Sequence, residues 1–230
     1  MNSPQTATLQ SAPYRPTDEP IEVIYADADL AVIIKPANLL TVPGRGPDKV
    51  DCAERRLRAL GHDFVRAAHR LDQDTSGLLI MGLSPAGHRA ANMMFEARAL
   101  EKRYEAVCWV KEAISGKRWE IDLPLALDWP NRPRHKVDFE SGKPSRTAIE
   151  LIDLAMGDEG SESTARLRLT PLTGRSHQLR VHLSHTGLPI CGDPLYGQDA
   201  LGRLHLHATQ LSFVHPLTGK PLTFQAPAPF

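Results

Sequence analysis

Short runs of alternating apolar and polar residues recur along the chain, and this pattern predicts mainly strands. Residues 21–25 and 30–35 are two such runs on either side of Asp27-Ala28-Asp29, which predicts a hairpin. Pro36 ends the second run, because proline cannot donate a hydrogen bond to a sheet. Further strands are expected at 104–110, 119–123, 147–154 and 165–169, and a terminal hairpin at 204–214 and 222–225 with its turn at 216–220.

Three segments carry the periodicity of helices. Ser84-Pro85 is typical of a helix start, because serine caps the first turn and proline suits it. This helix is expected to run to about Ala99. Its expected buried face consists of Ala90, Met93, Met94 and Ala97. The other helices are expected at 51–60, with Asp51 as the cap, and at 176–185.

Strands and helices are interspersed without a strict βαβ alternation, which predicts an α+β fold with a largely antiparallel mixed central sheet flanked by helices. Residues 1–20 are polar and rich in proline, so we expect an extended, loosely held tail. Residues 21–230 are expected to form one domain. Within it, the Pro- and Arg-rich stretch 124–136 is expected to be a junction or insertion, and 157–163 a turn.

Composition limits the classes of function. Lysine plus arginine and aspartate plus glutamate both number 27, so the formal net charge is zero. Proteins that bind mainly phosphate groups usually carry a basic excess, so an RNA site would have to be a local basic patch. No stretch approaches the roughly 18 apolar residues of a membrane span, and the N-terminus lacks the apolar run of a secretion signal. Cys52, Cys108 and Cys191 are odd in number and widely spaced, which favours reduced thiols in a cytoplasm.

Several histidines cluster in the last third of the sequence, at positions 177, 182, 185, 205 and 207. Their spacing fits no standard ligand pattern, and no acidic residues are interleaved among them. We therefore expect no metal site, and we expect His205 and His207 to be structural.

The stretch from His69 to Ile80 is a polar loop followed at once by an apolar strand. A carboxylate in such a loop can lie at the mouth of a cleft with rigid structure behind it. By spacing alone, Asp72 and Asp74 would more often be turn residues or a helix cap. The full segment HRLDQDTSGLLI, however, resembles the catalytic motif of the RluA/RsuA superfamily of pseudouridine synthases. This resemblance implies that Asp72 is the essential catalytic aspartate.

Other segments of that family occur in the expected order, from about Asp27 to the C-terminus. Lys35-Pro36 resembles the first motif, to which the family gives a mainly structural role. Lys102-Arg103-Tyr104 resembles the segment whose tyrosine lines the uracil pocket, although a strand tyrosine more often serves packing. The segment 174–182, GRSHQLRVH, implies that Arg175 pairs with the catalytic aspartate and that Leu179, a core residue in any case, touches the base. The segment 192–197, GDPLYG, matches a further family signature.

Two segments narrow the branch. Residues 42–45 and 128–133 are similar to the RluA branch, which lacks the S4 RNA-binding domain of other relatives, and a tail of about twenty residues predicts no such domain here. The resemblance implies substrates in 23S rRNA, at a hairpin, and in tRNA, at the anticodon stem-loop. We expect a monomer without an obligate protein partner.

The reaction implied by the resemblance is the isomerisation of uridine to pseudouridine, which is redox-neutral and predicts no cofactor. The target must leave a folded hairpin at a cost of roughly a few kcal/mol, and Arg70, two residues before Asp72, is expected to fill the vacated stack. The expected basic patch consists of Arg45, Arg70, Arg103, Arg132, Arg134, Lys136 and Arg175.

Two alternatives compete with this hypothesis. A non-catalytic RNA-binding or ribosome assembly factor could retain the fold, but it would not need Asp72, Tyr104 and Arg175 together. A carboxylate-dependent hydrolase would need a second catalytic carboxylate, for which Asp74 is the nearest candidate. Unchanged RNA and released base are the products that would distinguish these alternatives from an isomerase.

Overall fold

A computed structural model describes residues 14–110, 114–157, 162–197 and 202–230. In this part of the chain ten strands form one mixed sheet, with the central order β1-β2-β4-β11-β5-β10-β9-β6, while β3 pairs with β4 and β12 with β11. The strands are β1 Glu22–Ala26, β2 Leu30–Lys35, β3 Arg66–Ala67, β4 Ser76–Gly82, β5 Leu100–Val110, β6 Arg118–Asp122, β9 Arg146–Ala155, β10 Ser163–Pro171, β11 Leu206–Val214 and β12 Pro221–Gln225. The β4–β11 pair is parallel, and the other pairs are antiparallel. The expected α+β class is confirmed.

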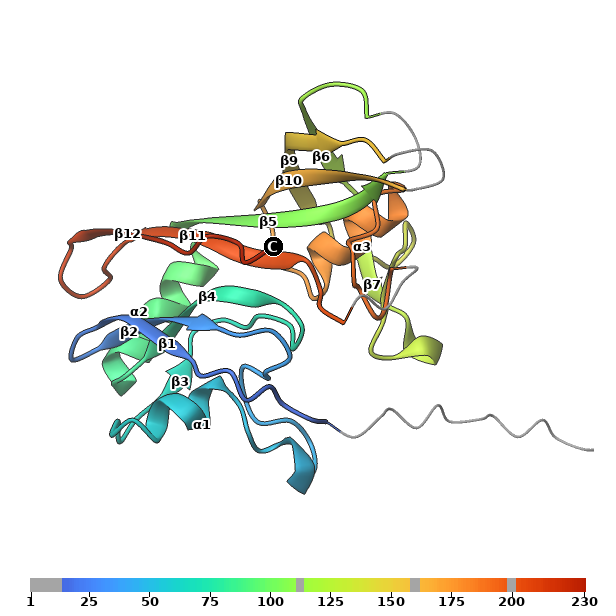
Figure 1. The fold of residues 1–230 in the computed structure, drawn as a ribbon. Coiled ribbons are helices and arrows are strands. Elements are labelled where there is room, and N and C mark those ends of the chain that lie inside the picture. The colour runs from blue at the N-terminus through green and yellow to red at the C-terminus, as the bar shows by residue number, and fades with distance from the viewer. Residues whose placement is uncertain (1–13, 111–113, 158–161, 198–201) are drawn as a thin grey trace, which may run out of the picture.

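Helices lie against both halves of the sheet. They are α1 Ala53–Arg58, α2 Pro85–Glu96 and α3 Gln178–His185, with 3-10 turns η1 Pro47–Lys49 and η2 Trp129–Asn131. A separate hairpin pairs β7 Leu125–Leu127 with β8 His135–Val137. Figure 1 shows β5 and β11 crossing the middle of the molecule, with α1 and α2 beside the β1–β2–β4 half and α3 and β7 beside the β9–β10 half.

The core is centred on β4, which is buried along its whole length. Leu78, Leu79 and Ile80 are fully buried there, opposite Ile34, Ile33 and Val32 of β2, respectively. Each large apolar side chain buried in this way stabilises the fold by about 1.5–3 kcal/mol. The loop that precedes β4 is therefore attached to a strand whose residues are all buried.

The start of α2 is confirmed, because the hydroxyl of Ser84 accepts a hydrogen bond from the N–H of Gly87. Its buried face differs from the prediction: Ala91 and Met94 are buried with Gly87, while Met93 and Ala97 are exposed and Ala90 is half-buried. The helix ends at Glu96, and the buried face is rotated by one position from the expected one.

Asp51 does not cap α1. The cap position is Cys52, and the carboxylate of Asp51 instead forms a two-bonded ion pair with Arg56, at 2.9 and 2.6 Å. Arg56 also donates to the backbone oxygens of Thr17 and Glu19.

These contacts attach residues 14–20, and Tyr14 is buried, so this part of the expected tail is held against the body of the protein. Residues 1–13, and residues 158–161 of the expected turn, lie outside the described residues. Within the described residues, the structure has no helix of the length and apolarity needed to cross a membrane.

Candidate active site

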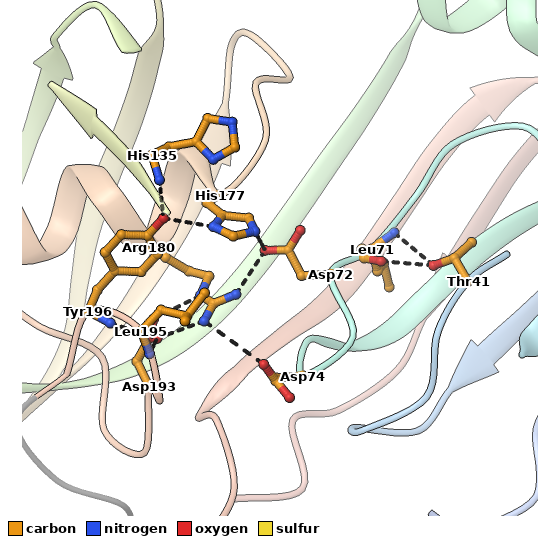
Figure 2. A network of polar contacts seen from close by, with 10 residues as sticks. All are labelled: Thr41, Leu71, Asp72, Asp74, His135, His177, Arg180, Asp193, Leu195 and Tyr196. Carbon is orange, nitrogen blue, oxygen red and sulfur yellow. Dashed lines mark hydrogen bonds and ion pairs between the residues drawn. The ribbon is translucent and has the colours of Figure 1, made fainter. Parts of the chain in front are cut away.

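Asp72 lies in the loop between β3 and β4, and its neighbours fix the backbone on both sides. The Thr41 hydroxyl donates to the carbonyl of Leu71 at 2.8 Å and accepts the N–H of Leu71 at 3.2 Å (Figure 2). The N–H of Thr75 donates to the carbonyl of Asp72 at 3.2 Å. The carboxylate, 28% exposed, is therefore presented to solvent from a constrained loop.

Lys35 holds the same loop from behind. Its side chain is fully buried, and Nζ donates to the carbonyls of Pro36, Leu39 and Gln73 at 2.9, 2.7 and 3.0 Å. Burial lowers the pKa of Lys35 to about 7, although the negative charges of Asp74 and Asp72 act to raise it. Three carbonyl acceptors match the three N–H groups of an ammonium, so we treat Lys35 as charged. The bond from Lys35 to the carbonyl of Gln73 therefore anchors the residue that lies between Asp72 and Asp74.

Tyr104 reaches the site through the pairing of three strands. Gly77 of β4 is opposite Ala208 of β11, and Ala208 is opposite Tyr104 of β5. Gly77 has φ +111°, and a Cβ on it would lie 2.4 Å from the oxygen of Ala208, so only glycine allows this close approach. Tyr104 is buried, and burial together with the nearby charge of Asp72 raises its pKa, which keeps the phenol protonated.

Arg180 is the cation that contacts Asp72. Its guanidinium, 2% exposed, donates through Nε and Nη2 to both oxygens of Asp193, at 2.8 and 2.7 Å. This fork leaves Nη1, which donates to Oδ2 of Asp72 at 3.2 Å, and Nη2 lies 4.0 Å from Oδ2 of Asp74 (Figure 2). Burial opposes the charge of Arg180, but the three carboxylates outweigh it and raise its pKa.

The other two carboxyl groups differ in their environment. Burial raises the pKa of Asp74, against the lowering effect of Arg180 and Lys35. Asp193 is also buried, yet its hydrogen bonds with Arg180 lower its pKa. Asp193 is therefore the permanent anionic partner of Arg180.

The expected pairing of Arg175 with Asp72 is wrong, because Arg180 makes it. Arg175 lies in the turn before α3 and is exposed, and its Nε donates to the carbonyl of Pro144 at 3.3 Å. Arg180 lies in the first turn of α3, on the side that faces the Asp72 loop. Both arginines belong to the same short segment of the sequence. Arg175 precedes α3 and contacts Pro144, whereas Arg180 lies within α3 and contacts Asp72.

Leu179 and Arg70 occupy contrasting positions. Leu179 is buried next to Arg180, in the core, while Arg70 is exposed two residues before Asp72. Contacts of Leu179, Arg70 and Arg175 with a substrate stay predictions.

A second group of side chains near Asp72 was not anticipated. His177 lies 4.0 Å from Oδ2 of Asp72, and its other ring nitrogen is 2.7 Å from the hydroxyl of Tyr196. Oδ1 of Asp193 accepts the N–H groups of Leu195 and Tyr196. Asp193 and Tyr196 both belong to the GDPLYG segment, which the sequence had marked as a family signature. That signature did not indicate what either side chain does.

The β7–β8 hairpin, from the stretch expected to be a junction or insertion, lies beside this group. Arg134 stacks over the ring of Tyr196 at 5.4 Å, and the ring of His135 lies 5.0 Å from that of His177. Two aromatic side chains of this segment, Trp129 and Phe139, are 65% and 76% exposed. The seven cations of the expected basic patch are all exposed: Arg45, Arg70, Arg103, Arg132, Arg134, Lys136 and Arg175.

Several known proteins are similar to this chain in sequence and in fold. The family model for RNA pseudouridylate synthase matches residues 29–185. The chain is 42% identical over 219 residues to the dual-specificity RNA pseudouridine synthase RluA of Pasteurella multocida (strain Pm70), covering 94% of this chain and 96% of that protein. It is 41% identical over 224 residues to the enzyme of the same name from Escherichia coli (strain K12), covering 94% and 98%. The solved structure of human RNA pseudouridylate synthase domain containing 1 matches with a TM-score of 0.74 and 28% identity, over 94% of this chain and 86% of that chain. The chain is therefore an isomerase that belongs to the RNA pseudouridylate synthase family.

Proposed function

We propose that Asp72 is the essential carboxylate of this synthase. The observation that carries the proposal is its setting: a partly exposed carboxylate in a constrained loop, paired with a buried arginine that a second carboxylate holds in place. An opposite charge nearby keeps a partly desolvated carboxylate ionised. Asp72→Asn tests this role: it keeps the shape of the side chain and removes its charge, so it should abolish pseudouridine formation.

The reaction breaks the N1–C1′ bond of uridine, turns the uracil, and joins C5 to C1′; C5 then loses its proton and N1 takes one up, so the sum is an isomerisation. The ionised Asp72 serves either of two routes: attack on C1′, or removal of the 2′ proton toward a glycal. Tyr104, protonated and beside Asp72, stacks on the uracil, and Leu179 packs against the base. No oxidant and no transferred group enter this balance, so the proposed reaction uses this chain's own residues without a cofactor.

The proposed substrates are uridines in hairpin loops of 23S rRNA and in tRNA anticodon stem-loops. The dual-specificity names of the two curated relatives support two RNA classes. Exposed arginines and the exposed Trp129 and Phe139 support contacts with unpaired RNA, because cations attract the backbone and aromatic rings stack on bases. We further propose that the protein acts as a monomer in the cytoplasm.

Pseudouridine mapping tests the choice of substrate. rRNA and tRNA would be isolated from cells that lack this protein, and from the same cells supplied with the wild-type or the Asp72→Asn protein. We expect one site in each RNA class to lose pseudouridine, and only the wild-type protein to restore it. Loss in a single class would reject dual specificity, and loss at no hairpin uridine would reject the proposed substrates.

Arg70 is proposed to occupy the stack that the flipped uridine vacates. Arg70→Ala should then slow the modification of a structured hairpin far more than that of a flexible single strand, because only the hairpin gives up stacking. Single-turnover rates on both RNAs across a salt series measure the difference. A phosphate contact alone would weaken both substrates alike and lower the salt slope by about one unit, and that outcome would reject the flipping role.

A further inference from the structure

The Tyr196 hydroxyl determines which nitrogen of His177 carries a proton. Its oxygen lies 2.7 Å from the backbone N of His135, which can only donate, and 2.7 Å from Nδ1 of His177 (Figure 2). The hydroxyl oxygen accepts the bond from His135, and among the described residues Nδ1 of His177 is the one acceptor that its own proton can reach, so the hydroxyl is fully satisfied when it donates to Nδ1. Nδ1 is then an acceptor, and a neutral imidazole with an acceptor at Nδ1 carries its proton on Nε2.

That Nε2–H points to the proposed catalytic carboxylate. Nε2 of His177 lies 4.0 Å from Oδ2 of Asp72, the same oxygen that accepts from Nη1 of Arg180. The distance is longer than a direct hydrogen bond, so in the free enzyme the N–H acts as an oriented dipole. Both interactions converge on Oδ2, and Oδ1 has no partner in the part of the chain that the structure describes.

His177 is held in this orientation from several sides. It has φ 54°, a left-handed conformation that is uncommon for a residue with a side chain, at the start of α3. Its ring lies 5.0 Å from the ring of His135 and 5.7 Å, edge-on, from that of Tyr196.

The charges around His177 favour the neutral ring. Burial lowers its pKa, and Arg180 and His135 lower it further, while Asp72 and Asp193 raise it. The net direction is downward, which agrees with the single-proton state that the hydroxyl of Tyr196 selects.

We propose that His177 is a positioning residue for the isomerisation: Tyr196 keeps its proton on Nε2, and that N–H, together with Arg180, holds Oδ2 of Asp72 so that Oδ1 is turned to the reacting ribose. The inference rests on the proposed role of Asp72. It also assigns a task to the GDPLYG segment, in which Asp193 positions Arg180 and Tyr196 positions His177.

The tautomer can be measured directly. In the full-length protein labelled with ¹⁵N-histidine, long-range ¹⁵N–¹H spectra distinguish a protonated Nε2 from a protonated Nδ1. We expect the His177 ring, identified by its loss in His177→Gln, to be neutral with its proton on Nε2 at pH 7. Tyr196→Phe should shift the ring toward a mixture of tautomers. A wild-type ring protonated on Nδ1 would overturn the inference.

Kinetics separates positioning from a merely structural role. We expect His177→Leu to lower the single-turnover rate by up to about 10²-fold, as displaced catalytic groups do, with unchanged RNA affinity. His177→Gln, whose terminal amide offers an N–H near the position of Nε2, should recover most of the rate.

Tyr14→Phe is the matched control for Tyr196→Phe. The Tyr14 hydroxyl likewise accepts a backbone N–H, from Leu40 at 3.0 Å, and donates to a carbonyl, of Asp51 at 3.1 Å. Both variants lose a buried hydroxyl, but only Tyr196→Phe should slow catalysis. If Tyr196→Phe does not fold, His177→Leu against His177→Gln gives the same comparison.

The results also separate two failures. Wild-type rates in His177→Leu and Tyr196→Phe, with Asp72→Asn inactive, would reject the inference about His177 alone. An active Asp72→Asn would reject the proposed role of Asp72, on which the inference rests.

Discussion

Arg180 shows how one buried side chain can link stability to chemistry. It forms an ion pair with Asp193 inside the protein and reaches Asp72 with its remaining nitrogen. A lysine at this position would have a single nitrogen and could not form the fork with Asp193 while also reaching Asp72. The planar arginine therefore suits a site in which two carboxylates share one cation.

Arg180→Met should lower the free energy of unfolding by about 3–5 kcal/mol, because it leaves Asp193 buried without its partner. Urea unfolding at pH 7 measures this change. The matched control is Arg175→Met, since Arg175 is exposed and its loss should change stability by no more than about 0.5 kcal/mol. Equal, small losses in the two variants would contradict the assignment of Arg180 as the buried arginine.

His69 gives the protein an acid-sensitive interior. Its Nε2 accepts the N–H of Ile80 at 3.1 Å, which requires the nitrogen to be unprotonated. Burial, and then the charge of Lys102, lower the pKa of His69 to about 3. Below its ordinary pKa of about 6.5 the unfolded chain takes up a proton at this histidine, while the folded protein does so only near pH 3. The stability is therefore complete above pH 6.5 and decreases as the pH falls toward 3.

The contribution of His69 should be up to about 1.4 kcal/mol per pH unit within that window. His69→Gln keeps an acceptor for Ile80 but does not titrate. Urea unfolding between pH 4 and 6 should therefore show a slope against pH that is smaller in the variant by about this amount. The remaining slope comes from other titrating groups, including His207, whose burial lowers its pKa to about 4, and carboxyl groups with a lowered pKa such as Asp193. Identical slopes would mean that His69 is protonated in the folded protein.

The two arginines also show where inference from the sequence ended. Both lie in the GRSHQLRVH segment, so the motif indicated which short segment supplies the cation that pairs with Asp72. The choice between them depends on where α3 begins and which side of its first turn faces the Asp72 loop, which is a matter of tertiary packing. Tyr104 is the only tyrosine of its segment, whereas Asp72 shares its motif with Asp74, so the choice of Asp72 came from the resemblance to the family motif.

The strands β4 and β11 approach each other closely at Gly77. They form the parallel pair of the sheet, which places Gly77 directly against the backbone of Ala208. The strands β4, β11 and β5 then carry the Asp72 loop and Tyr104 side by side. The spacing of β4 from β11 therefore contributes to the distance between the Asp72 loop and Tyr104.

Gly77→Ala should destabilise the protein by more than its backbone conformation alone explains. Gly61 is the matched control, because its φ is +104° and a Cβ there would meet nothing within 4 Å. We expect Gly61→Ala to cost about 1–3 kcal/mol through its backbone, and Gly77→Ala a further 1–3 kcal/mol, roughly, from crowding between the strands. Thermal or urea unfolding of both variants tests this difference, and equal losses would contradict it.

Sequence patterns predicted helices and strands well where neighbouring residues, such as caps and turns, determine where an element begins or ends. The terminal hairpin and the start of α2 at Ser84 follow from turn and cap residues. The same rules failed where a distant partner intervened: Asp51 pairs with Arg56 and the preceding segment, so it does not cap α1. The buried face of α2 shifted from Met93 to Ala91 because the helix is oriented by the sheet beneath it.

Considered as one structure, the protein assembles its site from distant parts of the chain. The loop with Asp72 comes from the half that contains β1, β2 and β4, while Arg180, Asp193 and Tyr196 come from the half that contains α3. β5 and β11 join the two halves, so the position of every catalytic group depends on the complete sheet. Pairings over such separations could not be inferred from local sequence, which is why His177 and Tyr196 were not anticipated.

The role of Asp72 is tested most directly by product analysis of wild-type and Asp72→Asn protein on a hairpin RNA. The wild-type protein should convert uridine to pseudouridine with no change in RNA mass. Asp72→Asn should bind the same RNA and retain its fold, because shape is kept, but should form no pseudouridine, because the charge is lost. Pseudouridine formed by the purified variant at a rate close to that of the wild type would contradict the account.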